Sequence, residues 1–176
     1  MSNKKFVYKK GFLHFEPNEA AIITAYKRSL SMGILPGSYT KGAGNMVGCL
    51  GEVAVELYLR NSVYVGDTEF NYDFLYRKNK VEVKSKSCGG LPKHNYSAFI
   101  NGNKSKVDNN DIYFFTRVKR DLSMVYLLGW LPSKKIDSVG IYREKGDVDE
   151  DNFVFRSKGY QIIISSLQKP KDIKKV

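Results

Sequence analysis

The fold is decided by the segment Asp73-Phe-Leu-Tyr-Arg-Lys-Asn-Lys-Val-Glu-Val-Lys84, which predicts two short strands joined by a tight polar turn. With a two-residue turn at Lys78-Asn79, Asp73 lies directly opposite Lys84 and diagonally from Glu82. Side chains two residues apart on a strand share one face. The pattern therefore gathers two carboxylates and one ammonium on one face of a sheet, while the valines on either side of the glutamate point to the other face and into a core.

Two carboxylates beside a lysine can form a divalent-metal site that cleaves phosphodiester bonds. Mg²⁺ prefers one or two carboxylates together with waters and a substrate phosphate. The ion lowers the pKa of a bound water and neutralises charge on the phosphate, while the lysine orients or deprotonates the water or stabilises the transition state. The alternative interpretation is a solvated, charge-paired strand face. We favour the metal site because this Glu-x-Lys is the only one in the chain and has an acid at a matching position one strand earlier.

Upstream of this hairpin the sequence predicts two helices, at 17–31 with Asn18 as its N-cap and at 45–60. The second helix carries Glu52, a third acid for the site, and Gly48 and Gly51 just before it permit close approach of this helix to the strands. Extended segments are predicted at 63–65, 69–76, 80–86, 111–118, 124–130 and 159–164. The segment 95–100 fits a short helix or a strand equally well. Helices followed by a mixed sheet predict an α/β or α+β domain, and we expect an α/β fold with a mixed sheet flanked by helices.

The chain of 176 residues is expected to form a single domain over 1–168, followed by a basic, mobile tail at 169–176. A 42% apolar content supports a real core and argues against disorder. The two cysteines lie in different contexts and suggest no disulfide framework. Without an apolar signal segment or a membrane-spanning run, we expect a soluble, cytoplasmic protein that does not act at a membrane.

The charge balance favours a polyanionic partner. The chain has 29 Lys and Arg against 18 Asp and Glu, a net charge of +11. Neutralising phosphates releases counterions and drives nucleic-acid binding. We therefore expect DNA as the partner and leave RNA open as a substrate. The phosphate contacts are predicted at lysines that flank the hairpin and the loops on either side of it, namely Lys41, Lys86, Lys93, Lys104 and Lys106.

Glu52, Asp73 and Glu82-Val-Lys84, set as helix, strand, turn and strand, resemble the active site of the PD-(D/E)xK nuclease superfamily over residues 42–130. The resemblance implies a restriction-endonuclease-like fold and a Mg²⁺- or Mn²⁺-dependent deoxyribonuclease. It implies Asp73, Glu82 and Glu52 as metal ligands and Lys84 as the catalytic lysine. The chain departs from the pattern at Tyr72, where the motif has proline, which reduces the specificity of the match but leaves the chemistry unchanged.

Two alternatives stay open beside a general DNA nuclease. Residues 41–86 also resemble archaeal-type Holliday junction resolvases, which would predict a symmetric homodimer and a structure-selective endonuclease. A non-catalytic nucleic-acid-binding module on a nuclease fold would predict salt-sensitive binding without a metal requirement. The intact Asp, Glu and Lys set argues against this second alternative, since an inactive site would be free to lose it.

Overall fold

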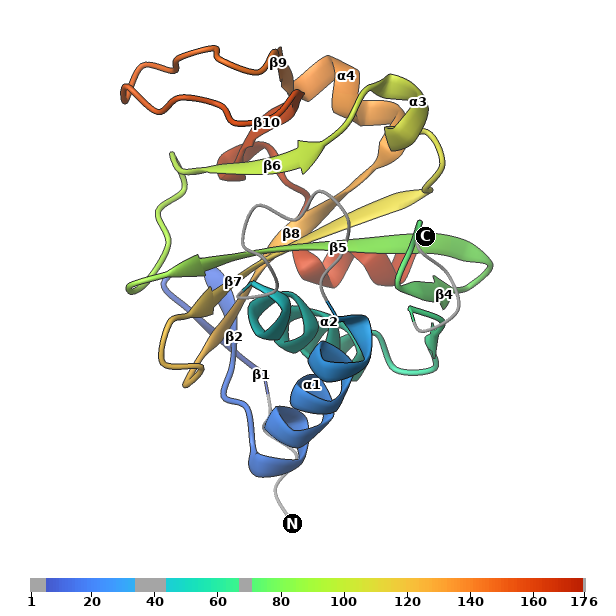
Figure 1. Ribbon diagram of the computed structural model, residues 1–176. Helices are drawn as coiled ribbons and strands as arrows, with labels where there is room; N and C mark the ends of the chain where they lie inside the picture. The colour runs from blue at the N-terminus through green and yellow to red at the C-terminus, as the bar shows by residue number, and fades with distance from the viewer. Residues whose placement is uncertain (1–5, 34–43, 67–70, 176) are drawn as a thin grey trace.

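The computed structural model describes residues 6–33, 44–66 and 71–175. It is a single α/β domain built around a mixed sheet (Figure 1). Helices α1 (Glu19–Met32) and α2 (Asn45–Leu59) cover one face of this sheet, and a smaller sheet lies over the other face. The predicted α/β class, with a mixed sheet flanked by helices, is confirmed.

The large sheet has seven strands in the order β1-β2-β8-β7-β5-β4-β3. Its members are β1 (Phe6–Lys9), β2 (Phe12–Phe15), β3 (Val63–Tyr64), β4 (Phe74–Tyr76), β5 (Asn79–Cys88), β7 (Ile112–Lys119) and β8 (Val125–Pro132). Strands β5 and β7 run parallel, and the other neighbouring pairs are antiparallel. Two parallel strands need a long connection between them. Residues 89–111 form this connection between β5 and β7.

The small sheet has the order β6-β10-β9, with both pairs antiparallel. Its strands are β6 (Ser97–Asn101), β9 (Ile141–Arg143) and β10 (Gly159–Ile163). The short helices are α3 (Lys104–Val107), α4 (Ile136–Val139), η1 (Ser133–Lys135), η2 (Ile164–Ser166) and η3 (Pro170–Lys175). The segment 95–100, which the sequence left undecided, therefore contributes mainly to a strand.

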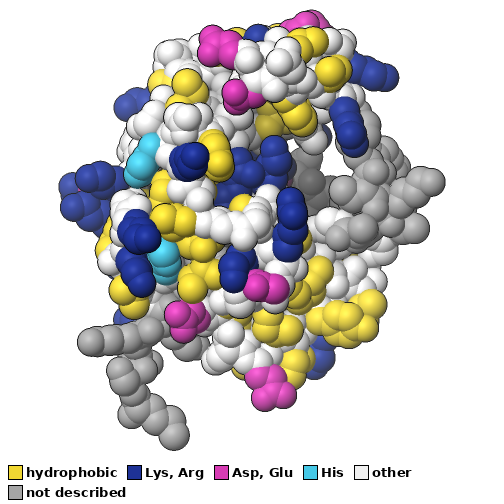
Figure 2. All heavy atoms as spheres, turned by 90° about the vertical axis from the view of Figure 1, so that its left-hand side faces the viewer, with side chains coloured by type: hydrophobic (Ala, Val, Ile, Leu, Met, Phe, Trp, Pro, Cys, Tyr) yellow, Lys and Arg dark blue, Asp and Glu magenta, His cyan; other side chains and the backbone are white. Residues whose placement is uncertain are grey.

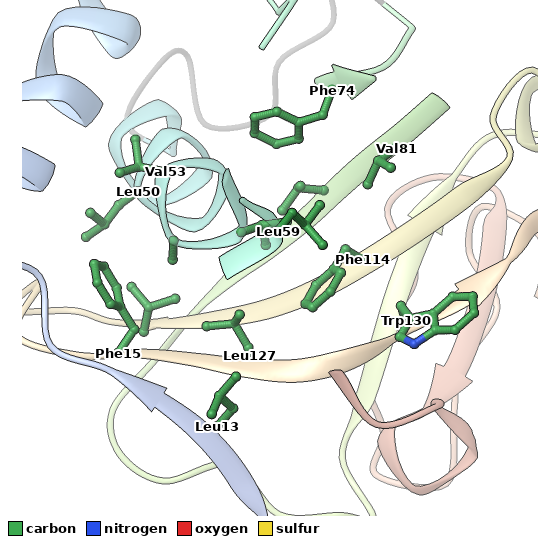
Figure 3. Packing of buried hydrophobic residues seen from close by; sticks show 14 of the residues in the cluster. Leu13, Phe15, Leu50, Val53, Leu59, Phe74, Val81, Phe114, Leu127 and Trp130 are labelled. Atoms are coloured by element: carbon green, nitrogen blue, oxygen red, sulfur yellow. The ribbon is translucent and has the colours of Figure 1, made fainter. Parts of the chain in front are cut away.

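The helical layer forms as predicted. Asn18 caps α1, because its side-chain oxygen accepts the backbone N–H of Ala21 at 3.0 Å. Leu50 and Val53 of α2 belong to one buried core that also contains Phe114 of β7 and Leu127 of β8 (Figure 3). This core fixes the position of α2 against β5 and β7.

A second core separates the two sheets. It contains Tyr113 and Phe115 from β7, Ile100 from β6 and Ile162 from β10. Because alternate residues of β7 enter the two cores, both faces of this strand are buried, and its whole length from Ile112 to Val118 is shielded from solvent.

The sequence missed the β1–β2 hairpin and strand β9. Each of these strands has only three or four residues, which is too few for a clear alternating pattern. The β1–β2 turn uses two positive φ angles, 50° at Lys10 and 86° at Gly11.

The C-terminal segment differs from the expected mobile tail. Residues 170–175 form η3, and Ile173 is completely buried in the core. Trp130 holds the preceding chain: its backbone exchanges two 3.0 Å hydrogen bonds with Gln168, and its indole Nε1–H donates to the Lys169 carbonyl at 3.2 Å. The sequence signal for this docking is an isoleucine, Ile173, among four charged residues. The strongly basic composition of the segment led instead to the prediction of a mobile tail.

Candidate active site

The hairpin that carries the predicted site turns one residue earlier than expected. The two turn residues are Arg77 and Lys78, and Asn79 is already in β5. Both turn residues have positive φ, 48° and 68°, which is the signature of a type I′ turn. Asn79 supports this turn by donating from its side chain to the Arg77 carbonyl at 3.2 Å.

The register of the hairpin changes with the turn. Phe74 pairs with Val81, so the predicted pairing of Asp73 with Lys84 is wrong. The prediction failed because asparagine is the more usual turn residue, whereas here it begins a strand. The shift is by an even number of residues, so Asp73 and Glu82 keep the same side of the hairpin.

Strand β5 alternates as the sequence predicts. Val81 and Val83 are buried in the core beneath α2, whereas Glu82 and Lys84 are half-buried on the opposite face. The Lys84 ammonium donates directly to the Glu82 carboxylate, and their side chains are 31% and 16% exposed. The pair is thus sheltered but reachable from solvent.

Lys84 is held as a cation. Burial acts to lower the pKa of Lys84, but the charge and hydrogen bond of Glu82, followed by the charge of Asp73, outweigh burial and raise it. A protonated lysine can stabilise negative charge on a phosphate and cannot act as a base. Of the roles predicted for this residue, its protonation favours transition-state stabilisation.

Asp73 lies where β4 separates from β5. Its carboxylate accepts the backbone N–H of Val83 at 2.7 Å, which fixes the side chain toward β5. Burial, and then the negative charges of Glu82 and Glu52, raise the pKa of Asp73 well above its usual value. The charges of the other two predicted acids therefore both act on Asp73.

Glu52 reaches the site through the close packing of α2 on the sheet. Its neighbour Gly51 lies so near β5 and β7 that a Cβ would come 2.0 Å from Ser85 Oγ and 2.6 Å from Thr116 Oγ1. The predicted role of a glycine in this approach holds for Gly51. It does not hold for Gly48, where a Cβ would meet nothing within 4 Å. Glu52 itself is buried, with 6% exposure.

The donor set suits a hard divalent cation. Asp73 and Glu82 supply the one or two carboxylates that Mg²⁺ binds alongside water. The negative charges of Glu82 and Glu52 raise the pKa of Asp73, and a bound cation would offset this repulsion. Within 6–33, 44–66 and 71–175, no three His, Cys, Asp or Glu side chains cluster closely enough to form a ready metal cage. Water and phosphate would complete the shell.

The predicted phosphate contacts are distributed over several elements. Lys86 is exposed on β5, two residues beyond Lys84, and Lys93 is exposed before β6. In α3, Lys106 is exposed and Lys104 forms an ion pair with Asp137, which offsets its charge. Lys41 lies outside the described residues.

Sequence reasoning missed one basic residue, Arg117. It lies on β7 directly beside Lys86 of β5, is 7% exposed, and donates to the Ser97 carbonyl at 2.6 Å. Burial, together with the charge of Arg117, lowers the pKa of Lys86. The sequence signal that could have identified Arg117 is an arginine inside an otherwise apolar strand, because a charged residue is rarely buried unless it has a partner.

The face at the C-terminal end of β5 is basic. Figure 2 shows Lys and Arg side chains grouped across its middle, with acidic side chains toward its top and bottom. The β7–β8 turn and the loop between β9 and β10 border the same face (Figure 1). An anionic chain crossing this face would pass beside the Lys84 strand.

Comparison with protein-family models and with curated proteins finds no match for this chain. Each described helix is too short or too polar to cross a lipid bilayer. The two cysteines, Cys49 and Cys88, are free thiols.

Proposed function

We propose that this protein is a divalent-metal-dependent nuclease that hydrolyses phosphodiester bonds in DNA, with a site of the PD-(D/E)xK kind. One observation carries the proposal: Asp73, Glu82 and Lys84 share one side of the β4–β5 hairpin, where the charge of Glu82 raises the pKa of both Asp73 and Lys84. The order of elements adds support, since α2 precedes the hairpin and β7 follows as the parallel neighbour of β5.

Each residue of the site has a separate task. Asp73 and Glu82 would hold a Mg²⁺ or Mn²⁺ ion, with Glu52 adding negative charge from α2. When bound, the metal supplies an acidified water and positive charge at the phosphate. Lys84, kept protonated by Glu82, binds a non-bridging phosphate oxygen and stabilises the charge that builds there. The Val83 N–H holds the Asp73 carboxylate in place throughout.

The electrostatics of the whole chain fit this substrate. A net charge of +11 favours association with a polyanion and concentrates it on the basic face. Binding is expected to weaken steeply with salt, as counterion release requires. Lys86 continues the Lys84 face of β5 and, in this proposal, contacts the phosphate next to the one that is cut.

A cleavage panel tests the proposal. Linear, circular, single-stranded and branched DNA, and RNA, are incubated with Mg²⁺, Mn²⁺ or a chelator. Glu82→Gln and Lys84→Ala are compared with Lys80→Ala, a matched control because Lys80 is an exposed lysine on the same face of the same strand. We expect metal-dependent cleavage that both site variants reduce by at least about 100-fold and that Lys80→Ala leaves intact.

The outcomes separate the alternatives. Cleavage that survives the chelator, or that Glu82→Gln leaves intact, would overturn the metal site. Salt-sensitive binding with no cleavage of any substrate would identify a binding module instead. Paired nicks across a four-way junction by a dimer would narrow the activity to a junction resolvase.

A further inference from the structure

An exposed phenylalanine lies beside the basic face, in the loop between β9 and β10. Phe153 is 48% exposed, although burial of an aromatic ring stabilises a fold. The loop is well braced: Val148 and Val154 form a β-bridge, and the Asp149 carboxylate accepts the N–H of Phe153 at 2.9 Å. These bonds brace the backbone of the loop, and the Phe153 ring itself packs edge-on against the Phe155 ring, with 5.3 Å between their centroids.

Cations adjoin this ring. The Lys86 ammonium lies 5.4 Å from the centroid of Phe153. Lys86 is paired across the sheet with Arg117, whose guanidinium donates at 2.6 Å to the carbonyl of Ser97, the residue that follows Tyr96; Tyr96 is 44% exposed. We call Phe153, Lys86, Arg117 and Tyr96 the aromatic–basic strip: an exposed ring comes first and last in this series, with two basic residues between them, of which Arg117 is buried.

The strip lies close to the candidate active site. Lys86 follows Glu82 by four residues on the same side of β5, a separation of about 13 Å at the usual rise of a strand. Sites for unpaired nucleic acid combine cations that follow the backbone with aromatic rings on which bases stack. In a duplex the bases are stacked on one another, so they are not free to stack on exposed aromatic rings of the protein.

We infer that the aromatic–basic strip binds unpaired nucleotides next to the cleaved bond, so that the preferred substrate is single-stranded or carries a single-stranded branch. Phe153 stacks on a base, Lys86 contacts the backbone, and Arg117 adds positive charge from below. Tyr96 receives a second base on the far side. The inference rests on the proposed function and specifies its substrate.

Binding without cleavage tests the strip directly. In chelator, fluorescence anisotropy measures the Kd for a labelled single strand and for a hairpin duplex of equal length. Phe153→Leu keeps apolar bulk for the loop but removes the stacking ring. We expect it to raise the single-strand Kd about fivefold or more and to leave the duplex Kd unchanged. Tyr26→Leu is the control, since Tyr26 is an exposed aromatic residue on α1, away from the strip.

A tryptophan variant provides an independent readout. Trp130 is the single tryptophan of the chain and is 3% exposed, so Phe153→Trp introduces a surface fluorophore. If a base stacks there, single-strand affinity is retained and the new fluorescence is quenched on binding. Unaltered single-strand binding by Phe153→Leu, or unquenched Phe153→Trp fluorescence with bound oligonucleotide, overturns the strip while leaving the nuclease proposal intact. Wild-type protein that binds no single strand in chelator also overturns the strip, whereas absence of metal-dependent cleavage in the substrate panel overturns the nuclease proposal.

Discussion

Ser85 of β5 occupies the space where Gly51 of α2 would carry a side chain, with its Oγ 2.0 Å from the position of a Cβ. The contact brings α2 close to the sheet and carries the next residue, Glu52, toward Asp73. Packing and electrostatics of the candidate site therefore depend on one missing methyl group.

Gly51→Ala should push α2 away from β5, because the added Cβ would come 2.0 Å from Ser85 Oγ, 2.6 Å from Thr116 Oγ1 and 3.0 Å from Ser85 Cβ. Overpacking of this kind costs about 1–3 kcal/mol, and cleavage should fall as Glu52 moves. Gly48→Ala is the matched control: its Cβ meets nothing within 4 Å, and alanine in a helix should add about 1 kcal/mol of stability. Chemical denaturation measures both; a Gly51→Ala protein as stable as wild type would contradict the close contact.

Asp73→Asn should stabilise the metal-free protein. The pKa of Asp73 is raised on folding, so the folded state binds its proton more tightly, and stability falls as pH rises from about 3.9, the unfolded value, through the folded pKa. Asparagine carries no titrating carboxyl group, so this loss of stability with rising pH disappears. Its side-chain oxygen can still accept the hydrogen bond from the Val83 N–H. We expect a Tm gain at pH 7 of about 2–4 °C, which corresponds to roughly 1 kcal/mol.

Thermal melts from pH 5 to 8 in chelator check this prediction, with Glu150→Gln, an exposed loop acid, as the control. Saturating Mg²⁺ or Mn²⁺ should then raise the Tm of the wild type by mass action and have less effect on Asp73→Asn. A wild-type Tm that rises with pH across this range and does not change with either ion would count against the raised pKa of Asp73 and against a metal site there.

Lys78→Gly should stabilise the hairpin. Lys78 has a φ of 68°, a conformation that glycine adopts without strain and that type I′ turns favour. The expected gain is about 0.5–1 kcal/mol in denaturant unfolding. The same change at Lys80, inside the strand, should instead cost about that amount. A destabilised Lys78→Gly protein would place the turn elsewhere.

Ile173→Ala should destabilise the domain by about 2–4 kcal/mol, because a fully buried isoleucine loses its contacts and leaves a cavity. Lys171→Ala, two residues earlier and exposed, should be neutral. Denaturation midpoints measure both. Equal stability of the two variants would mean that η3 is detached from the core.

The sequence predicted the parts of the fold that follow from local periodicity. Helix α2 has an apolar stripe and Asn18 caps α1, so their positions were predicted closely. Strand β7 is a long apolar run and was equally clear. By contrast, the small sheet is assembled from short strands far apart in the chain, and no local pattern encodes such pairing.

The candidate site was predicted through the period of two along β5, which survives an even register shift. The identity of the turn residues was not predicted correctly, because Arg77 and Lys78 have no intrinsic preference for positive φ. Arg117 and Phe153 were also missed. Their significance depends on which strand and which loop lie beside Lys86, and only the tertiary structure supplies that information.

The connectivity of the two sheets has a consequence for how the molecule comes apart. Along the chain, β6 of the small sheet comes between β5 and β7 of the large sheet, whereas β9 and β10 come after β8. The chain therefore returns to the large sheet before the small sheet is complete. No single cut of the backbone can release the small sheet as an intact piece. Amide protection in the two sheets should therefore be lost together, as one cooperative unit.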